Sequence, residues 1–174
     1  MQVRLVDCDR SRSPEILAIL NEAIQNSTAL YDYRPRTASM MNAWFDAKEQ
    51  GKYPVIGAVD EANRLRGFAT YGPFRERPAY KYSVEHSVYV ERDSRGFGIG
   101  RKLLEAIIEQ ARTQNYHTLI GGIDAENVVS IDLHRKLGFV FCGEIRDAGF
   151  KFGRWLHLHF YQRILDTPAH PVDG

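Results

Sequence analysis

Cysteines and long apolar runs are scarce in this chain. Cys8 and Cys142 are the two cysteines among 174 residues, which is too few for a disulfide-stapled secreted domain and favours two reduced thiols over one bridge. No apolar stretch approaches the about 20 residues of a membrane-spanning helix. The N-terminus alternates like a strand and lacks the apolar core of a signal peptide. We therefore expect a cytoplasmic location and no membrane partner.

The chain also lacks an excess of either charge. Its 23 basic and 22 acidic residues give a formal net charge of +1, which argues against a nucleic-acid partner. The hydrophobic fraction of 44% and the charged fraction of 26% are ordinary for a globular domain with a real core. We predict one domain over residues 1–165. Residues 166–174 contain two prolines and no apolar periodicity, which predicts a frayed tail.

Apolar residues recur at strand spacing and at helix spacing in turn. Strands are predicted over residues 2–6, 54–59, 65–71, 80–90, 118–123, 139–144 and 155–163, and helices over 14–26, 37–50, 98–115 and 127–137. Ser13 and Thr37 are the predicted N-caps of the first two helices, and Gly51 is expected to end the second. Residues 60–64 are expected to form a hairpin turn. This order predicts an α/β fold with a mixed sheet and helices on both of its faces.

The most informative segment is Arg95-Gly96-Phe97-Gly98-Ile99-Gly100-Arg101, between an alternating strand and an amphipathic helix. Glycines let the backbone turn sharply and approach a ligand, while the free N–H groups and dipole of a helix N-terminus favour phosphate. A P-loop would need Lys-Ser or Lys-Thr after its last glycine, and the dinucleotide fingerprint fails by one position. The segment therefore predicts a pyrophosphate-binding loop flanked by two arginines, with a simple helix-capping turn as the alternative.

Two spacings resemble the Gcn5-related N-acetyltransferase (GNAT) superfamily. Arg95-x-x-Gly98-x-Gly100 is similar to its coenzyme A loop, and the segment from Asn127 to Gly138-Phe139 is similar to its later signature. An N-cap and a C-cap would explain Asn127 and Gly138 individually. Both signatures in this order, with an apolar strand between them, favour the superfamily. The resemblance implies the GNAT fold, with a mixed and mostly antiparallel sheet, and acetyl-CoA as cosubstrate.

Further runs narrow the resemblance to the phosphinothricin and methionine sulfoximine acetyltransferase branch. They are residues 31–37, 72–80, 84–90 and 149–155, so the likeness extends over nearly the whole chain. It implies an N-acetyltransferase for the α-amino group of a small amino-acid-like compound such as methionine sulfoximine, methionine sulfone or phosphinothricin. A homodimer is also expected. Open alternatives are another acceptor (a polyamine, an aminoglycoside or a protein N-terminus) and a non-catalytic coenzyme A-binding module.

Glu85 is the candidate general base. An ammonium group has no lone pair, so the acceptor must lose a proton before it attacks. Strand alternation puts Glu85 and Ser87 on one face and His86 on the other, among apolar residues. A carboxylate is uncommon in a strand, although a solvent-facing glutamate would also explain it. The match to the strand glutamate of the branch favours a base that acts directly or through water.

Two histidines are weaker candidates. His86 is expected to pack as a neutral side chain, with its backbone beside the acceptor pocket. Many superfamily members carry a tyrosine in the later helix as general acid toward the leaving thiolate, and the resemblance places His134 at that position, as in the phosphinothricin branch. Imidazole titrates near neutrality and could serve, although an ordinary helix-surface histidine is an equal explanation.

Arg75 and Arg77 flank Glu76 in a proline-bounded loop before this strand. Two residues apart in an extended segment, their guanidinium groups can point the same way and hold an α-carboxylate. Two solvated loop arginines are the simpler alternative, and the resemblance favours substrate binding. The predicted acceptor site consists of Arg75, Glu76, Arg77, Glu85, His86 and Ser87.

The predicted coenzyme site extends over three segments. The edge of Val88-Tyr89-Val90 is expected to hydrogen-bond the pantetheine arm like an added strand, and the amides of residues 96–101 to hold the pyrophosphate. Asn127 is expected to reach the same arm.

No metal is predicted. His157 and His159 share a strand face, but no third ligand lies at a plausible spacing. The branch resemblance implies an aspartate near position 157, so His157 is a departure that concerns the rim of the site or a dimer contact.

Overall fold

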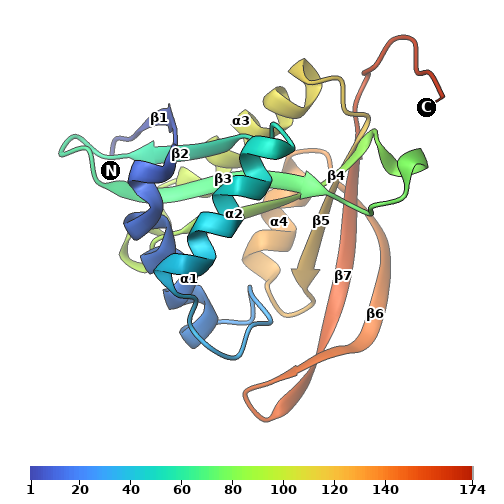
Figure 1. The fold of residues 1–174 in the computed structure, drawn as a ribbon. Coiled ribbons are helices and arrows are strands. Elements are labelled where there is room, and N and C mark those ends of the chain that lie inside the picture. The colour runs from blue at the N-terminus through green and yellow to red at the C-terminus, as the bar shows by residue number, and fades with distance from the viewer. Residues whose placement is uncertain (174) are drawn as a thin grey trace. The chain divides into compact units, whose positions relative to one another are not determined.

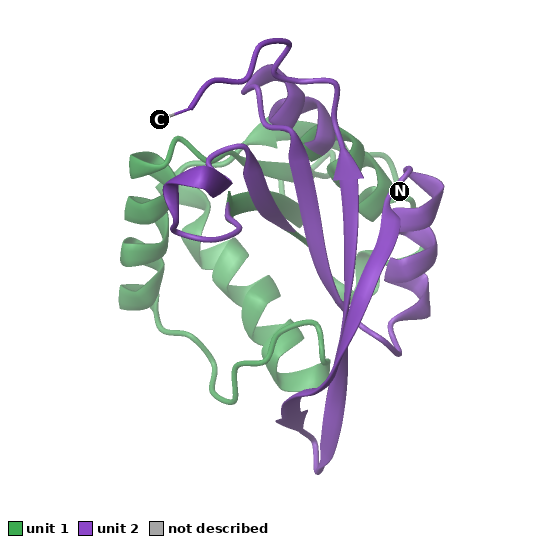
Figure 2. Ribbon diagram, turned by 90° about the vertical axis from the view of Figure 1, so that its right-hand side faces the viewer, with its two compact units in different colours: residues 1–72, 87–107 green, residues 73–86, 108–174 purple. Residues whose placement is uncertain are grey.

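The computed structural model describes residues 1–173, which form two compact units (Figure 2). Residues 1–72 and 87–107 make the first unit, and residues 73–86 with 108–173 make the second. The helices and strands (Figure 1) are β1 Arg4–Asp7, α1 Ser13–Asn26, α2 Ala38–Gln50, β2 Val55–Val59, β3 Leu65–Pro73, β4 Ser83–Val90, α3 Ile99–Thr113, β5 Thr118–Asp124, α4 Val128–Lys136, β6 Val140–Lys151 and β7 Arg154–Ile164.

The strands pair in the order β1-β2-β3-β4-β5-β7-β6. The β4–β5 pair is parallel, while the β1–β2, β2–β3, β5–β7 and β6–β7 pairs are antiparallel. The predicted mixed and mostly antiparallel sheet is therefore confirmed. No helix within residues 1–173 is long and apolar enough to cross a membrane.

In the first unit, successive residues of β3 face helices on opposite sides. Phe68 is fully buried in the core of the unit, with its ring centroid 6.2 Å from that of Trp44 in α2. A Cβ at Gly67 would instead lie 3.1 Å from Leu103 Cδ1 in α3. Because side chains alternate along a strand, β3 is covered on both faces, as predicted.

In the second unit, β6 is much longer than the predicted strand 139–144. It continues to Lys151, with register shifts between Phe141 and Gly143 and between Ile145 and Gly149. These β-bulges absorb residues that break the alternation, which is why the sequence pattern ended too early. Phe152 and Gly153, at φ 53° and 75°, form the two-residue turn that joins β6 to β7.

The predicted helix signals have mixed outcomes. Thr37 and Asn127 each accept a backbone N–H in the first turn of α2 and α4, at 3.4 and 3.1 Å. Gly51 follows the last residue of α2, as predicted. Ser13 is not a cap, because the short 3-10 helix Arg10–Arg12 leads directly into α1 and Ser13 is its first residue.

Two other boundaries differ from the prediction. The strand expected over residues 80–90 begins at Ser83, since the 3-10 helix Pro78–Tyr80 precedes it. Some residues of the expected frayed tail are held by hydrogen bonds. Asp166 accepts from Arg112 at 2.8 Å, and the Tyr82 hydroxyl accepts the N–H of Val172 at 3.1 Å.

Candidate active site

The parallel pairing of β4 with β5 is short. It joins Ser83 to Thr118, Val84 to Leu119 and Glu85 to Ile120 and then ends, although both strands continue beyond it. Pairing with β5 therefore does not use the backbone groups of residues 87–90. Such a strand edge can take a ligand as an added strand, as predicted for the pantetheine arm.

Glu85 lies at the last pair of this ladder and is half-buried. Its carboxylate lies over Gly122 of β5, where a Cβ would be 3.1 Å from Glu85 Oε1. Burial raises the pKa of Glu85, and the positive charge of Arg75 opposes this rise. The carboxylate is thus a stronger proton acceptor than that of an exposed glutamate. Its partial burial argues against the alternative of a solvent-facing side chain.

The structure brings Arg75 into the surroundings of Glu85, where its positive charge acts on the carboxylate. The Arg75 guanidinium lies over the ring of Phe74 at 4.4 Å and donates to the Phe74 carbonyl oxygen at 3.1 Å. The carbonyl oxygen of Arg77 accepts the N–H of Tyr80, which places Arg77 at the start of the following 3-10 turn. Glu76 and both arginines are exposed. The shared carboxylate clamp stays a prediction.

His86 and His134 form a buried pair that was not predicted. Their Nε2 atoms are 2.9 Å apart, and their rings stack with centroids at 5.1 Å. The helix-surface explanation for His134 is therefore wrong, because this side chain is 95% buried, with 5% of its surface exposed. His86 is buried as expected, and burial followed by the proximity of His134 lowers its pKa to about 3. Burial also lowers the pKa of His134.

Each ring nitrogen of His134 lies within hydrogen-bond distance of a partner. His134 Nδ1 is 2.7 Å from the carbonyl oxygen of Ser130, so this nitrogen carries the hydrogen and donates. His134 Nε2 then accepts from the Nε2–H of His86. Both ring nitrogens of His134 are thus engaged, and its role as general acid toward a leaving thiolate stays a prediction.

Two adjacent glycines of β5 make room for these side chains. Neither glycine was predicted as a site residue from the sequence. A Cβ at Gly121 would lie 2.9 Å from His86 Cε1, and a Cβ at Gly122 would lie 3.1 Å from Glu85 Oε1. Glycine weakens a strand interior, so a pair of them there is a signal of close approach. Gly121 and Gly122 accommodate the histidine pair and the carboxylate on opposite faces of β5.

The glycine loop, residues 96–101, has the open backbone expected of a phosphate site. Gly96 and Gly98 have φ of 84° and 77°, and no atom lies within 4 Å of a Cβ built at either position. Helix α3 begins at Ile99, and the N–H of Lys102 bonds to the Gly98 carbonyl oxygen at 3.2 Å. The N–H groups before Lys102 are those that a helix N-terminus leaves for a ligand. These residues fit the pyrophosphate of coenzyme A.

The two arginines of the loop are each paired with a carboxylate. Arg95 contacts Glu22 of α1 at 2.8 Å and donates to the Val90 carbonyl oxygen at 3.2 Å, while Arg101 contacts Glu105 at 2.8 Å. Both remain at least half-exposed. Their predicted contribution to anion binding therefore requires them to share their charge with these partners.

The other predicted coenzyme residues differ in what they can offer. The side chain of Ile99 is buried, so only its backbone is available, while Phe97 is half-exposed. Residues 87–90 are all partly buried. Asn127 Oδ1 caps α4 by accepting the Ser130 N–H, which leaves the amide NH₂ for its predicted contact with the pantetheine arm.

The two strand histidines of β7 are engaged by β6. His159 Nε2 is 3.0 Å from Glu144 Oε2, and His157 Nδ1 accepts the Asp147 N–H at 3.1 Å. Over residues 1–173, no group of three His, Cys, Asp or Glu side chains could hold a metal ion.

The chain belongs to the GNAT acetyltransferase family, because the profile of the acetyltransferase (GNAT) domain matches residues 13–160. It is 43% identical over 166 residues to the L-methionine sulfoximine/L-methionine sulfone acetyltransferase of Pseudomonas paraeruginosa, covering 95% of this chain and 96% of that protein. The structure of an Acinetobacter baylyi protein aligns with a TM-score of 0.98 and 54% identity, over 99% and 97% of the two chains.

A third comparison bears on the cosubstrate. The phosphinothricin acetyltransferase of Sinorhizobium meliloti, solved in complex with acetyl-CoA, aligns with a TM-score of 0.94 and 34% identity, over 98% of this chain and 93% of that one. The predicted GNAT fold and the predicted class, an acetyl-CoA-dependent N-acetyltransferase, are thereby confirmed.

Proposed function

We propose that this enzyme acetylates the α-amino group of a small amino-acid-like acceptor of the methionine sulfoximine, methionine sulfone or phosphinothricin type. The relatives' names support this class of acceptor. The observation that carries the proposal is Glu85, a half-buried carboxylate with a raised pKa at the end of the β4–β5 ladder, within the influence of Arg75.

Acetyl-CoA supplies the acetyl group as a thioester when it is bound. On the side of the protein, the amides of the glycine loop hold the pyrophosphate and the edge of residues 88–90 holds the arm, with the Asn127 amide as a further donor. Glu85 and Val88 are three residues apart on one strand. One strand thus carries both the proposed base and the proposed start of the coenzyme edge.

Glu85 takes the proton of the acceptor's ammonium group onto its carboxylate, which frees the nitrogen lone pair. A raised pKa brings Glu85 closer to the pKa of the group that it deprotonates and makes the transfer less uphill. Arg75 contributes a positive charge that can bind the acceptor's α-carboxylate, and Arg77 is the proposed second arginine of this carboxylate clamp. Glu76, Ser87 and the backbone of His86 border this acceptor site in the proposal.

The test is thiol release from acetyl-CoA with a panel of acceptors. Methionine sulfone, methionine sulfoximine and phosphinothricin should release thiol, whereas spermidine, an aminoglycoside and a peptide N-terminus should release little. Glu85→Gln should lower kcat by about 10²–10⁴ with unchanged acetyl-CoA affinity, and the exposed Glu61→Gln serves as the matched control. Preference for another amine, or no turnover despite acetyl-CoA binding, would contradict the proposal.

We further propose that the enzyme is a cytoplasmic homodimer. The hairpin of β6 and β7 exposes large apolar side chains, among them Phe152 and Trp155, which support contact with a second copy. Both cysteines are free thiols, which supports a reducing compartment. Light scattering on purified protein should give twice the chain mass, and Trp155→Glu should shift it toward the monomer.

A further inference from the structure

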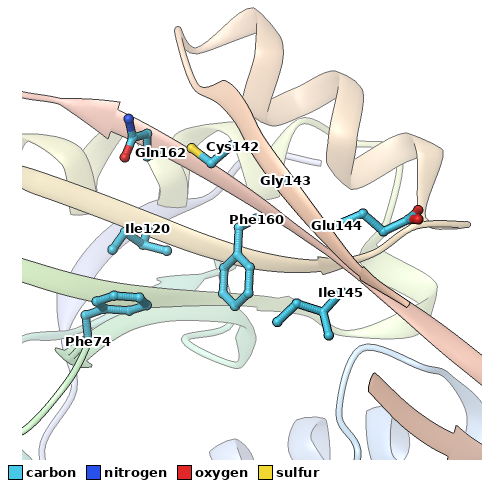
Figure 3. Close-up of a pocket in the computed structure, with 8 residues that line it drawn as sticks. All are labelled: Phe74, Ile120, Cys142, Gly143, Glu144, Ile145, Phe160 and Gln162. Atoms are coloured by element: carbon cyan, nitrogen blue, oxygen red, sulfur yellow. The ribbon is translucent and has the colours of Figure 1, made fainter. Parts of the chain in front are cut away.

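A cavity of about 320 Å³ lies in the second unit (Figure 3). Its size is at the lower end of small-molecule sites, which span roughly 300–1,000 Å³. The apolar side chains of its wall come from four segments of the unit. The lining residues are Phe74, Ile120, Cys142, Gly143, Glu144, Ile145, Phe160 and Gln162.

Some residues that line the cavity neighbour the two charged groups of the proposed acceptor site. Ile120 is the β5 residue paired with Glu85. Phe160 Cε1 and Glu85 Oε1 lie 3.9 and 3.1 Å from the same point, the position of a Cβ at Gly122. Phe74, another residue of the lining, has the Arg75 guanidinium over its ring. An amino acid with its amine at Glu85 and its carboxylate at Arg75 would have this cavity within reach of its side chain.

The polar groups of the cavity differ in their availability. Glu144 is held by Arg146 at 2.9 Å and by His159 at 3.0 Å, and Figure 3 shows its carboxylate pointing away from the aromatic rings. Gln162 follows Phe160 by two residues in β7, so both side chains extend from the same face of the strand. Figure 3 shows the Gln162 amide near Cys142. Gln162 is the side chain of the lining whose amide offers both a strong donor and a strong acceptor to a ligand.

We infer that this cavity is the subsite for the acceptor's side chain and that Gln162 donates its amide N–H to an oxygen near the end of that chain. The inference rests on the proposed function and makes Gln162 a specificity-determining residue. Phe74, Ile120, Ile145 and Phe160 surround the methylene groups, and a short unbranched chain fits the space. A sulfone oxygen accepts the amide hydrogen well, whereas a thioether sulfur is a weak acceptor.

The experiment compares L-methionine sulfone with L-methionine, which differ by the two sulfone oxygens. Gln162→Met keeps the shape of the side chain but removes the donor. It should lower kcat/KM for the sulfone by about 5- to 100-fold, the range for an unmatched buried polar group. The value for methionine should change by less than about threefold. The exposed Gln50→Met in α2 is the matched control and should leave both values unchanged.

A second variant tests the cavity without depending on Gln162. Ile145 is half-exposed, so Ile145→Trp can fill the space with little cost to folding, and it should raise the acceptor KM with an unchanged acetyl-CoA KM. If the wild type acetylates the sulfone and both variants keep its kcat/KM, the subsite is wrong while the proposed function stands. If the wild type acetylates neither amino acid nor any member of the acceptor panel, the proposed function itself fails.

Discussion

Arg75 and Glu85 together set the expected pH dependence of acetylation. The base must be ionised, so kcat/KM should rise as pH increases through the pKa of Glu85. Arg75 lowers that pKa, and Arg75→Gln should therefore move the acid limb of the profile to higher pH. Arg77→Gln is the matched control and should lower the height of the profile without moving the limb. A limb that stays in place in Arg75→Gln would show that Arg75 does not act on the base.

Replacing each of the two adjacent glycines of β5 by alanine should give a different defect, one in activity and the other in stability. The new Cβ at position 122 would crowd Glu85 Oε1 at 3.1 Å, so Gly122→Ala should lower kcat by up to about 10²-fold through misplacement of the base. The Cβ at position 121 would meet the His86 ring at 2.9 Å. Gly121→Ala should cost about 1–3 kcal/mol of stability through overpacking.

Urea unfolding and kcat, measured on both variants, separate the two effects. Equal defects in both measurements for both variants would mean that the glycines serve only the packing of the strand. Most of the proposed chemistry thus depends on single residues, of which some could be predicted from the sequence and others only from the structure. Glu85 could be predicted from its strand position and family pattern, whereas the space that accommodates it depends on a neighbouring strand.

At the scale of elements, the junction of the glycine loop with α3 is the proposed anion site. Gly98 has a φ of 77° with open space around it, so Gly98→Val should force the backbone away from this conformation. Loss of one charge-assisted contact would weaken acetyl-CoA binding by roughly 10- to 150-fold. Calorimetry measures this directly.

The hairpin turn offers a matched control for this variant. Gly153 has a φ of 75° and equally open surroundings, so Gly153→Val imposes the same kind of strain outside the loop. It should leave acetyl-CoA affinity unchanged. Similar losses in both variants would indicate general strain and contradict the anion site.

Most elements could be predicted from local patterns because their signals are local. Apolar periodicity and caps such as Thr37 and Asn127 act within one turn of helix. The length of β6 could not be predicted, because Gly143 and Gly149 lie at shifts of its register against β7. Only pairing with the neighbouring strand keeps such a segment extended.

For the whole molecule, the histidine pair links stability to pH. The pKa of folded His86 is about 3, against 6.5 for an ordinary histidine. As pH falls below about 6.5, the unfolded chain takes up a proton that the folded chain refuses, so the free energy of unfolding should decrease toward pH 3. His86→Gln keeps an amide donor for His134 and should flatten this dependence.

Urea unfolding between pH 7.5 and 4.5 tests the linkage. The exposed His170→Gln is the matched control and should follow the wild type. A His86→Gln curve parallel to that of the wild type would place the acid sensitivity elsewhere.

The sequence by itself determined the family and led to the proposed coenzyme loop and the proposed base, because each depends on residue types at fixed spacing along one segment. The tertiary structure alone decided the partner of His134, the role of Gly121 and Gly122, and the cavity that Phe160 helps to line. These features join residues of different strands and helices. Local periodicity records which face a side chain takes, but not which side chain of another element it will meet there.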